Sequence, residues 1–243
     1  MSPSIRKLKG RIDALVKGVD LAACPDPSTI TSVRHALNEH KAIVFDNVNL
    51  DNAGQERVAR WFGDLTTAHP NVPAADGTRN VPAVDSETSK ANEWHTDVTF
   101  ARRSATTPPR KEYDRGFIPT PYETEHRLVR VHRLPGERGL FIGGLAQRIV
   151  GLSSNESADL LRVLQSYVTR PENILRRTWS PDQLLILGNR ITQHYGVDNL
   201  DDHPRRFNRV TVAGDVPPGV DGRRSEPLVG DASHCISVPG VAA

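Results

Sequence analysis

The chain contains 243 residues with a mass of 26.8 kDa, enough for one sizeable domain or at most two small ones. Apolar residues make up 37% and charged residues 25%, as in a globular protein, and a formal net charge of +2 is too small to indicate nucleic-acid binding. The two cysteines, Cys24 and Cys235, form no disulfide or metal-binding pattern, which favours a reducing compartment. Because the chain shows neither a membrane-spanning apolar run nor a signal-peptide core, we expect a cytoplasmic protein without a membrane partner.

The first part of the chain predicts short strands and two helices. Residues 7–22 alternate loosely around two glycines, which favours one or two strands joined by a turn. Asp26-Pro27-Ser28 is a helix start, and apolar residues follow it at helical spacing. Residues 42–45 predict a buried strand. Asn52, with Gln55 three positions later, resembles a capping box and predicts a second helix.

The second part predicts further strands and one more helix. Residues 128–132 and 139–142 flank Pro135-Gly136 and predict a hairpin. Ser153 and Glu156 form a capping box before a helix that we expect to bury Leu160, Leu161, Leu164 and Val168. Other strands are predicted at 81–84, 184–187, 191–197 and 209–212. Helices early and strands later, without regular βαβ alternation, indicate an α+β fold with a β-sandwich or jelly-roll core.

The stretch EWHTDVTF, residues 93–100, places a histidine and an aspartate two positions apart in a strand-like run. Alternate residues of a strand point to the same face, so His95 and Asp97 project side by side while Thr96 faces away. An imidazole and a carboxylate on one face are good ligands for a divalent metal, and two histidines with one carboxylate form the site of non-haem Fe(II) oxygenases. A single His-x-Asp also arises by chance, so a surface histidine is the competing interpretation.

A third ligand must come from elsewhere, and His194 is the best candidate among the other histidines. It lies in ILGNRITQHYGV, a strand-like run late in the chain. Arg205 and Arg209 follow it 11 and 15 positions later. A buried arginine can pair bidentately with a carboxylate or a sulfonate, although solvated surface arginines are the alternative.

Three segments together resemble one known family. EWHTDVTF, NRITQHYGV and RRFNRVTVAGD, in this order, are similar to the taurine dioxygenase (TauD/TfdA) family, and the similarity extends from about Ile12 to about Asp215. The resemblance implies a single dioxygenase domain over residues 1–243. Its expected fold is a double-stranded β-helix, or jelly roll, with flanking helices. The most similar members are expected to be alkyl sulfatases and taurine dioxygenases.

The resemblance also implies a role for each site residue. His95, Asp97 and His194 would hold Fe(II), and Arg205 would bind the distal carboxylate of 2-oxoglutarate. Arg209 would lie near the iron, between the other carboxylate of 2-oxoglutarate and the substrate. Two further residues would bind substrate: His69 matches a histidine that contacts the sulfonate in taurine-type members, and Asn92 lies one position away from an asparagine that lines the substrate site.

The implied reaction consumes 2-oxoglutarate and O₂, releases succinate and CO₂, and hydroxylates a carbon of a small anionic substrate. If that carbon carries a sulfonate or a sulfate ester, the product breaks down to an aldehyde and sulfite or sulfate. Asp97, in place of glycine or alanine, favours hydroxylation over halogenation. The alternatives are hydroxylation of an amino acid or another carboxylate, a degenerate metal-binding relative without activity, and a metal-independent jelly-roll binding module. The family also implies a homo-oligomer, either a dimer or a tetramer.

One departure from the family concerns length. Asp97 and His194 are 97 positions apart, and members of the family usually carry several tens of residues more in this interval. The sequence therefore predicts a missing or shortened segment near residues 109–112, which would open the site and expose apolar neighbours. Smaller departures are LGNR at residues 187–190, where relatives often have WDNR, and Arg177, where tryptophan is common.

Overall fold

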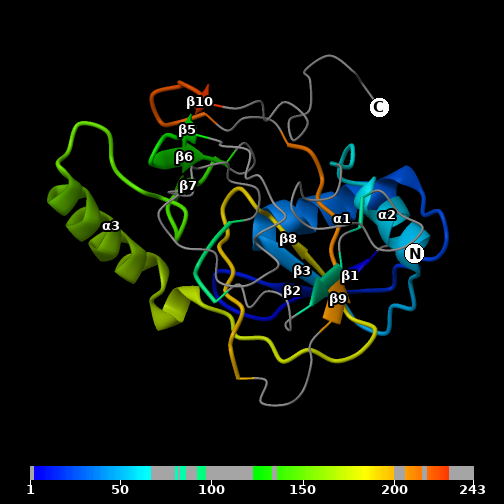
Figure 1. Ribbon diagram of the computed structural model, residues 1–243. Helices are drawn as coiled ribbons and strands as arrows, with labels where there is room; N and C mark the ends of the chain where they lie inside the picture. The colour runs from blue at the N-terminus through cyan, green and yellow to red at the C-terminus, as the bar shows by residue number, and fades with distance from the viewer. Residues whose placement is uncertain are drawn as a thin grey trace, which may run out of the picture.

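A computed structural model of the chain describes residues 3–66, 80–81, 83–85, 92–96, 123–132, 136–199, 206–214 and 218–229. A four-stranded mixed sheet forms its centre, in the order β1-β2-β3-β8 (Figure 1). The strands are β1 (Ser4–Lys7), β2 (Ala14–Lys17), β3 (Ala42–Phe45) and β8 (Leu184–Leu187). The pair β2–β3 is parallel and the other two pairs are antiparallel. The predictions of strands within residues 7–22, at 42–45 and at 184–187 are thereby confirmed.

Helix α1 (Pro27–His40) connects the two parallel strands, which need a crossover of this length. The Asp26 carboxylate accepts a hydrogen bond from the backbone N–H of Thr29 at 3.0 Å, and proline occupies the first helical turn. The helix ends where Lys41 adopts a left-handed conformation with φ of 65°. Val33 and Ala36 lie fully buried against the sheet, so α1 covers one face of β2 and β3.

Helix α2 (Asn52–Ala59) completes the core beside α1. Its cap is Asp51, whose carboxylate accepts from the N–H of Gly54 at 2.7 Å, so the prediction that Asn52 caps this helix is wrong by one residue. Both residues are good caps, and sequence alone does not decide between neighbours. The hydrophobic core unites the two helices with the sheet: Ala14, Val16, Leu21, Val33, Ala36, Ile43, Phe45, Val58 and Trp61.

Three short antiparallel pairs surround the central sheet. The predicted hairpin is confirmed as β6 (Val129–Val131) with β7 (Arg138–Leu140). The second pair is β5 (Glu123–Glu125) with β10 (Glu226–Val229), and the third is β4 (Ala83–Asp85) with β9 (Arg206–Asn208).

Two strand predictions late in the chain are wrong. Residues 191–197 form no strand, because a turn over residues 189–191 is closed by the bond from the Ile191 N–H to the Gly188 carbonyl at 3.0 Å. His194 makes one isolated antiparallel bridge there. The strand predicted at 209–212 ends earlier, as β9, and Val212 forms only an isolated bridge with Leu65.

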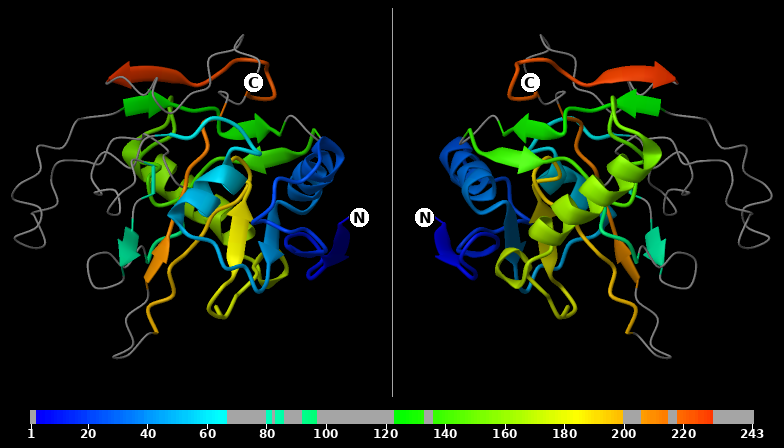
Figure 2. Two further views of the ribbon diagram at one scale, coloured as in Figure 1. Left: turned by 90° about the vertical axis from the view of Figure 1, so that its right-hand side faces the viewer. Right: turned by 90° about the vertical axis from the view of Figure 1, so that its left-hand side faces the viewer.

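Helix α3 (Ser154–Val168) lies apart from the central sheet, at the left of Figure 1 and in front of the sheet in the right-hand view of Figure 2. The predicted capping box is present: the Ser153 N–H donates to the Glu156 carboxylate at 2.8 Å, and the Glu156 N–H donates to the Ser153 hydroxyl. The burial prediction is wrong for Leu160, which is 39% exposed, and the other three residues are only half-buried. A single 3₁₀ turn, η2 (Pro171–Asn173), follows the helix. Within the described ranges, we find no helix with the length and apolar character needed to cross a bilayer.

Arg177, one of the departures from the family, has a structural partner. Its guanidinium donates to the carboxylate of Asp13 at 2.6 Å, and Asp13 is fully buried at the start of β2. A buried carboxylate without a counter-charge would be strongly destabilising. In this chain Arg177 therefore holds the segment before β8 against the start of β2, an inner strand of the central sheet.

A second buried cation lies at the β6–β7 hairpin. The Arg130 guanidinium donates to Nδ1 of His126 at 2.7 Å and to the hydroxyl of Ser225 at 3.2 Å, and it stacks on the Phe141 ring at 3.2 Å from the ring centre. Burial, together with the positive charge of Arg130, lowers the pKa of His126 to about 4. His126 is therefore neutral at pH 7, and its unprotonated Nδ1 serves as an acceptor.

We predict that His126 makes folding sensitive to acid. Its pKa in the folded protein lies below the ordinary value of about 6.5, so the unfolded chain binds more protons between these two values. The contribution of His126 to stability is complete above about pH 6.5, and falls by at most roughly 3 kcal/mol as the pH drops toward 4. His126→Asn keeps an acceptor near the position of Nδ1 but does not titrate, so its free energy of unfolding should fall less over this range.

Urea denaturation between pH 4 and 7 measures this difference. His35→Asn is the matched control, because His35 lies exposed on α1. Parallel stability curves for the wild-type protein and His126→Asn would contradict the prediction.

Candidate functional site

Two histidines that are almost a hundred positions apart in sequence lie directly opposite each other. His95 and His194 form an isolated antiparallel bridge. The His95 N–H donates to the His194 carbonyl at 3.0 Å, and the His194 N–H donates to the His95 carbonyl at 2.8 Å. Directly opposed residues of such a bridge project to the same side. The backbone therefore places both imidazoles on one face, which we call the front of the bridge.

The imidazoles are close enough to act together. Their ring centres are 4.2 Å apart and the ring planes are inclined by 58°. Bonds from a metal ion to imidazole nitrogens are only about 2 Å long, so two rings that bind one ion must approach each other closely, as these do. Nδ1 of His95 lies 2.7 Å from the Glu93 carbonyl, which can only accept a hydrogen bond, so Nδ1 carries the proton. In the neutral ring, Nε2 is then the nitrogen without a proton, and this is the form that ligates a metal.

The other face of the bridge, which we call its back, carries the neighbouring side chains. The Trp94 and Tyr195 rings are in contact, with centres 5.5 Å apart. The Thr96 hydroxyl donates to the Thr192 carbonyl at 3.0 Å, and Thr96 is buried. These contacts connect residues that flank His95 with residues that flank His194.

A large cavity of about 1240 Å³ opens behind the bridge. Trp94, Thr96, Thr192 and Gln193 line one side of it, and β7 and the end of α3 line the other. Neither His95 nor His194 borders this cavity. This cavity is therefore bordered by residues beside the two histidines and not by the histidines themselves.

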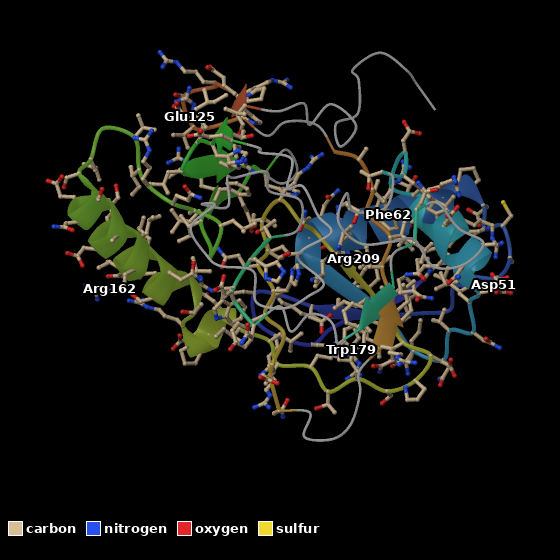
Figure 3. All side chains as sticks on the ribbon, in the orientation of Figure 1. Asp51, Phe62, Glu125, Arg162, Trp179 and Arg209 are labelled. Carbon is tan, nitrogen blue, oxygen red and sulfur yellow. The ribbon has the colours of Figure 1, made fainter. Side chains whose placement is uncertain are left out.

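The structure describes four of the seven residues predicted for the site. It brings His95 and His194 together, and Asn92 is exposed three residues before His95. Arg209 is half-buried just after β9 and appears in the middle of Figure 3. His69, Asp97 and Arg205 lie outside the described residues. In the part of the chain that the structure describes, no three His, Cys, Asp or Glu side chains gather as metal ligands.

Sequence reasoning missed the segment that supports the bridge from behind, residues 142–144. The Gly144 N–H donates to the Trp94 carbonyl at 2.8 Å. Gly143 has φ of +138°, and a Cβ at this position would lie 2.9 Å from the Trp94 carbonyl oxygen. The Gly143-Gly144 pair at the end of an apolar run was the available signal, because glycine marks close approach of two backbones.

Comparison with known proteins identifies the family. The protein-family model described as "Taurine catabolism dioxygenase TauD, TfdA family" matches residues 4–107 and 102–211. The chain belongs to this family. It is therefore a 2-oxoglutarate-dependent dioxygenase, and the family implies Fe(II), 2-oxoglutarate and O₂ as its cofactor and cosubstrates.

The relatives include proteins that act on sulfate esters. An alpha-ketoglutarate-dependent sulfate ester dioxygenase of Pseudomonas putida is 36% identical and covers 91% of this chain and 93% of its own length. An alkylsulfatase of Acinetobacter baylyi is 34% identical, with 91% and 88% covered. A crystal structure of a taurine dioxygenase from Burkholderia xenovorans superimposes with a TM-score of 0.81 at 31% identity, covering 97% of this chain and 98% of that one.

The comparisons also bear on chain length. The alignment with the Pseudomonas putida protein extends over 280 residues, more than the 243 of this chain, so that relative has stretches without a counterpart here. The family model matches in two pieces whose ends meet at residues 102–107, close to the predicted shortening at 109–112. The position of the shortening stays a prediction, because residues 97–122 lie outside the described ranges.

The described residues fit the iron site that the family implies. Two imidazoles on one face, one of them held by a carbonyl at its second nitrogen, are donors that suit Fe(II). The hydrogen bond to the Glu93 carbonyl fixes both the tautomer and the ring direction of His95. The backbone thus holds the two rings on one face without any bound metal.

Gly143→Ala should disturb this arrangement. The new methyl group would press on the Trp94 carbonyl in a conformation that only glycine adopts readily, so we expect a loss of about 2 kcal/mol in the free energy of unfolding. Because Trp94 precedes His95, affinity for Co(II), a spectroscopic substitute for Fe(II), should fall as well. Urea denaturation and Co(II) titration measure the two effects.

Gly151→Ala is the matched control. Gly151 also has a positive φ, of +89°, but a Cβ there meets nothing within 4 Å. We expect a loss of about 1 kcal/mol in stability and unchanged Co(II) affinity. Equal metal affinity of both variants would show that the contact between Gly143 and Trp94 does not matter for the site.

Proposed function

We propose that this dioxygenase hydroxylates a small organic anion, either a sulfate ester or a sulfonate, at the carbon that bears the sulfur-containing group. The observation that carries the proposal is the His95–His194 bridge, which presents two imidazoles on one face in a chain 36% identical to a sulfate ester dioxygenase. The finer architecture that we propose is the jelly roll, supported by the superposition on a taurine dioxygenase.

The proposed ligands of Fe(II) are His95, His194 and Asp97. Two imidazoles and one carboxylate occupy one side of the ion and leave the other side for cosubstrate and O₂. When bound, Fe(II) and 2-oxoglutarate supply the activation of O₂ that converts 2-oxoglutarate to succinate and CO₂ and leaves a hydroxyl group on the substrate carbon. The proposed role of the protein is to hold the metal ligands in place and to orient 2-oxoglutarate and the substrate anion.

Arginines and one histidine are proposed to orient these anions. Arg205 would pair bidentately with the distal carboxylate of 2-oxoglutarate. Arg209 is half-buried, so its charge is only partly screened by water, and it would lie between the cosubstrate and the substrate anion. His69 and Asn92 would complete the substrate site. The hydroxylated product of a sulfate ester then loses sulfate and leaves an aldehyde, and that of a sulfonate loses sulfite.

The homo-oligomeric state and the cytoplasmic location remain predictions. Both derive from family resemblance and composition, and sedimentation together with cell fractionation would test them.

The test of the function begins without oxygen. Adding Fe(II) and 2-oxoglutarate to the folded protein should produce the weak visible charge-transfer band of the chelate, and His95→Ala should abolish both iron binding and the band. His35→Ala, at an exposed position on α1, is the control and should leave the band unchanged. A folded wild-type protein without the band would refute the proposal.

Oxygen is then admitted in the presence of alkyl sulfates, alkanesulfonates or carboxylates. Release of sulfate or sulfite in equal amounts with succinate supports the proposed substrate class. Succinate release coupled only to a carboxylate or an amino acid would replace it by the alternative hydroxylase. A band without turnover on any of these compounds would identify an inactive relative.

Arg205→Ala should mainly raise the requirement for 2-oxoglutarate. Loss of a charge-assisted bidentate pair weakens binding by roughly 2 kcal/mol, equivalent to about a thirtyfold increase in the apparent dissociation constant. Arg206→Ala is the matched control, because Arg206 is the adjacent residue and lies exposed in β9. Unchanged 2-oxoglutarate affinity of Arg205→Ala, measured from the charge-transfer band, would contradict the assignment.

A further inference from the structure

On the back of the His95–His194 bridge, the side chain of Gln193 makes two hydrogen bonds. The Gln193 amide group donates to the Ile142 carbonyl at 2.6 Å. Its oxygen accepts from the amide of Gln165, on α3, at 2.9 Å. One side chain thus connects three segments that are distant in sequence, and it belongs to the residue immediately before His194.

Hydrogen bonds from this region contact both halves of the bridge. Gln193 is bonded to Ile142, and the N–H of Gly144, two residues further on, is bonded to the Trp94 carbonyl beside His95. Segment 142–144 therefore spans the back of the bridge and fixes the residue before each histidine. A Cβ on Gly143 would lie 3.6 Å from the Gln193 amide, an ordinary contact distance, so the segment passes directly beside this side chain.

A cavity lies next to these hydrogen bonds. Behind a typical bridge, packed side chains would resist a shift of the backbone. Here the side chains of Trp94, Thr96, Thr192 and Gln193 border about 1240 Å³ of open space instead. The bonds of Gln193 add directed contacts at the residue immediately before His194.

We propose that Gln193 is a positioning residue for the metal centre, with Gln165 as its support from α3. It holds the backbone of His194 against that of His95, so that both imidazoles keep the spacing and direction needed to bind one ion. It does not touch the metal or the substrate. The proposal rests on the proposed metal-binding function and goes further, because it connects α3, a helix remote from the front of the bridge, to metal affinity.

Gln193→Met and Gln165→Ala test the proposal. Methionine preserves the length of the side chain but makes neither bond, so affinity for Co(II) should fall about tenfold, the lower end of the range for residues that orient ligands from outside the coordination sphere. The visible absorption of bound Co(II), which reports ligand geometry, should change. Gln165→Ala removes only the bond from α3 and should cause a smaller loss in the same direction.

Gln183→Ala is the matched control. Gln183 also makes two bonds through its amide, one from the Ser180 N–H at 3.0 Å and one to the Asp46 carboxylate at 2.8 Å, but it lies before β8, away from the bridge. Its loss should lower thermal stability by a comparable amount without changing Co(II) affinity or absorption. A purely structural role for Gln193 would make the two variants indistinguishable in metal binding.

The outcomes separate this inference from the proposed function. If the wild-type protein binds Co(II) and Gln193→Met binds it with equal affinity and an identical spectrum, the positioning role is wrong and the metal site stands. If Gln193→Met does not fold, Gln165→Ala decides: unchanged affinity and spectrum overturn the proposal. If the folded wild-type protein binds no Co(II), the metal site itself is wrong and the positioning role falls with it.

Discussion

The two backbone hydrogen bonds between His95 and His194 are the interaction on which the site depends. They join two segments that the sequence separates by almost a hundred positions, and in the described stretches 92–96 and 189–199 no continuous strand accompanies them. Because directly opposed residues of an antiparallel bridge share one face, these bonds alone decide that the two imidazoles point together. The hydrogen bond from Nδ1 of His95 to the Glu93 carbonyl then selects the nitrogen that faces a metal.

An isolated bridge is weak by itself, and the surrounding contacts compensate for this. The Trp94 and Tyr195 rings are in contact, Thr96 bonds to the Thr192 carbonyl, and residues 142–144 connect the two halves from behind.

Local chemistry made part of the fold predictable. Asp26 before proline and the pair of Ser153 with Glu156 identified two helix starts correctly, because a cap bonds within its own turn. The run at 42–45 was recognised because four consecutive apolar residues must be buried. Asp51 and Asn52 are equally good caps, so the boundary of α2 required the structure. The exposure of Leu160 depends on what lies beside α3, which no local pattern encodes.

The residues of the site were likewise only partly predictable from the sequence. His95 and His194 could be selected because ligand type, order and the following arginines together form a family pattern. The predicted strand at 191–197 was wrong because the turn at residues 189–191 interrupts it, yet the isolated bridge in this segment falls on His194, the proposed metal ligand. Gln193 could not be found, since its partners, Ile142 and Gln165, are 51 and 28 positions away and nothing in the sequence pairs them.

X-ray absorption at the iron edge, on protein loaded with one Fe(II) per chain, tests the central claim most directly. Imidazole rings produce characteristic scattering beyond the first shell, so the number of histidine ligands can be counted. Two imidazoles per iron are expected for the wild-type protein, and one for either His95→Ala or His194→Ala if iron is retained. A spectrum without imidazole scattering, or one that neither substitution changes, would contradict a metal centre built on this bridge.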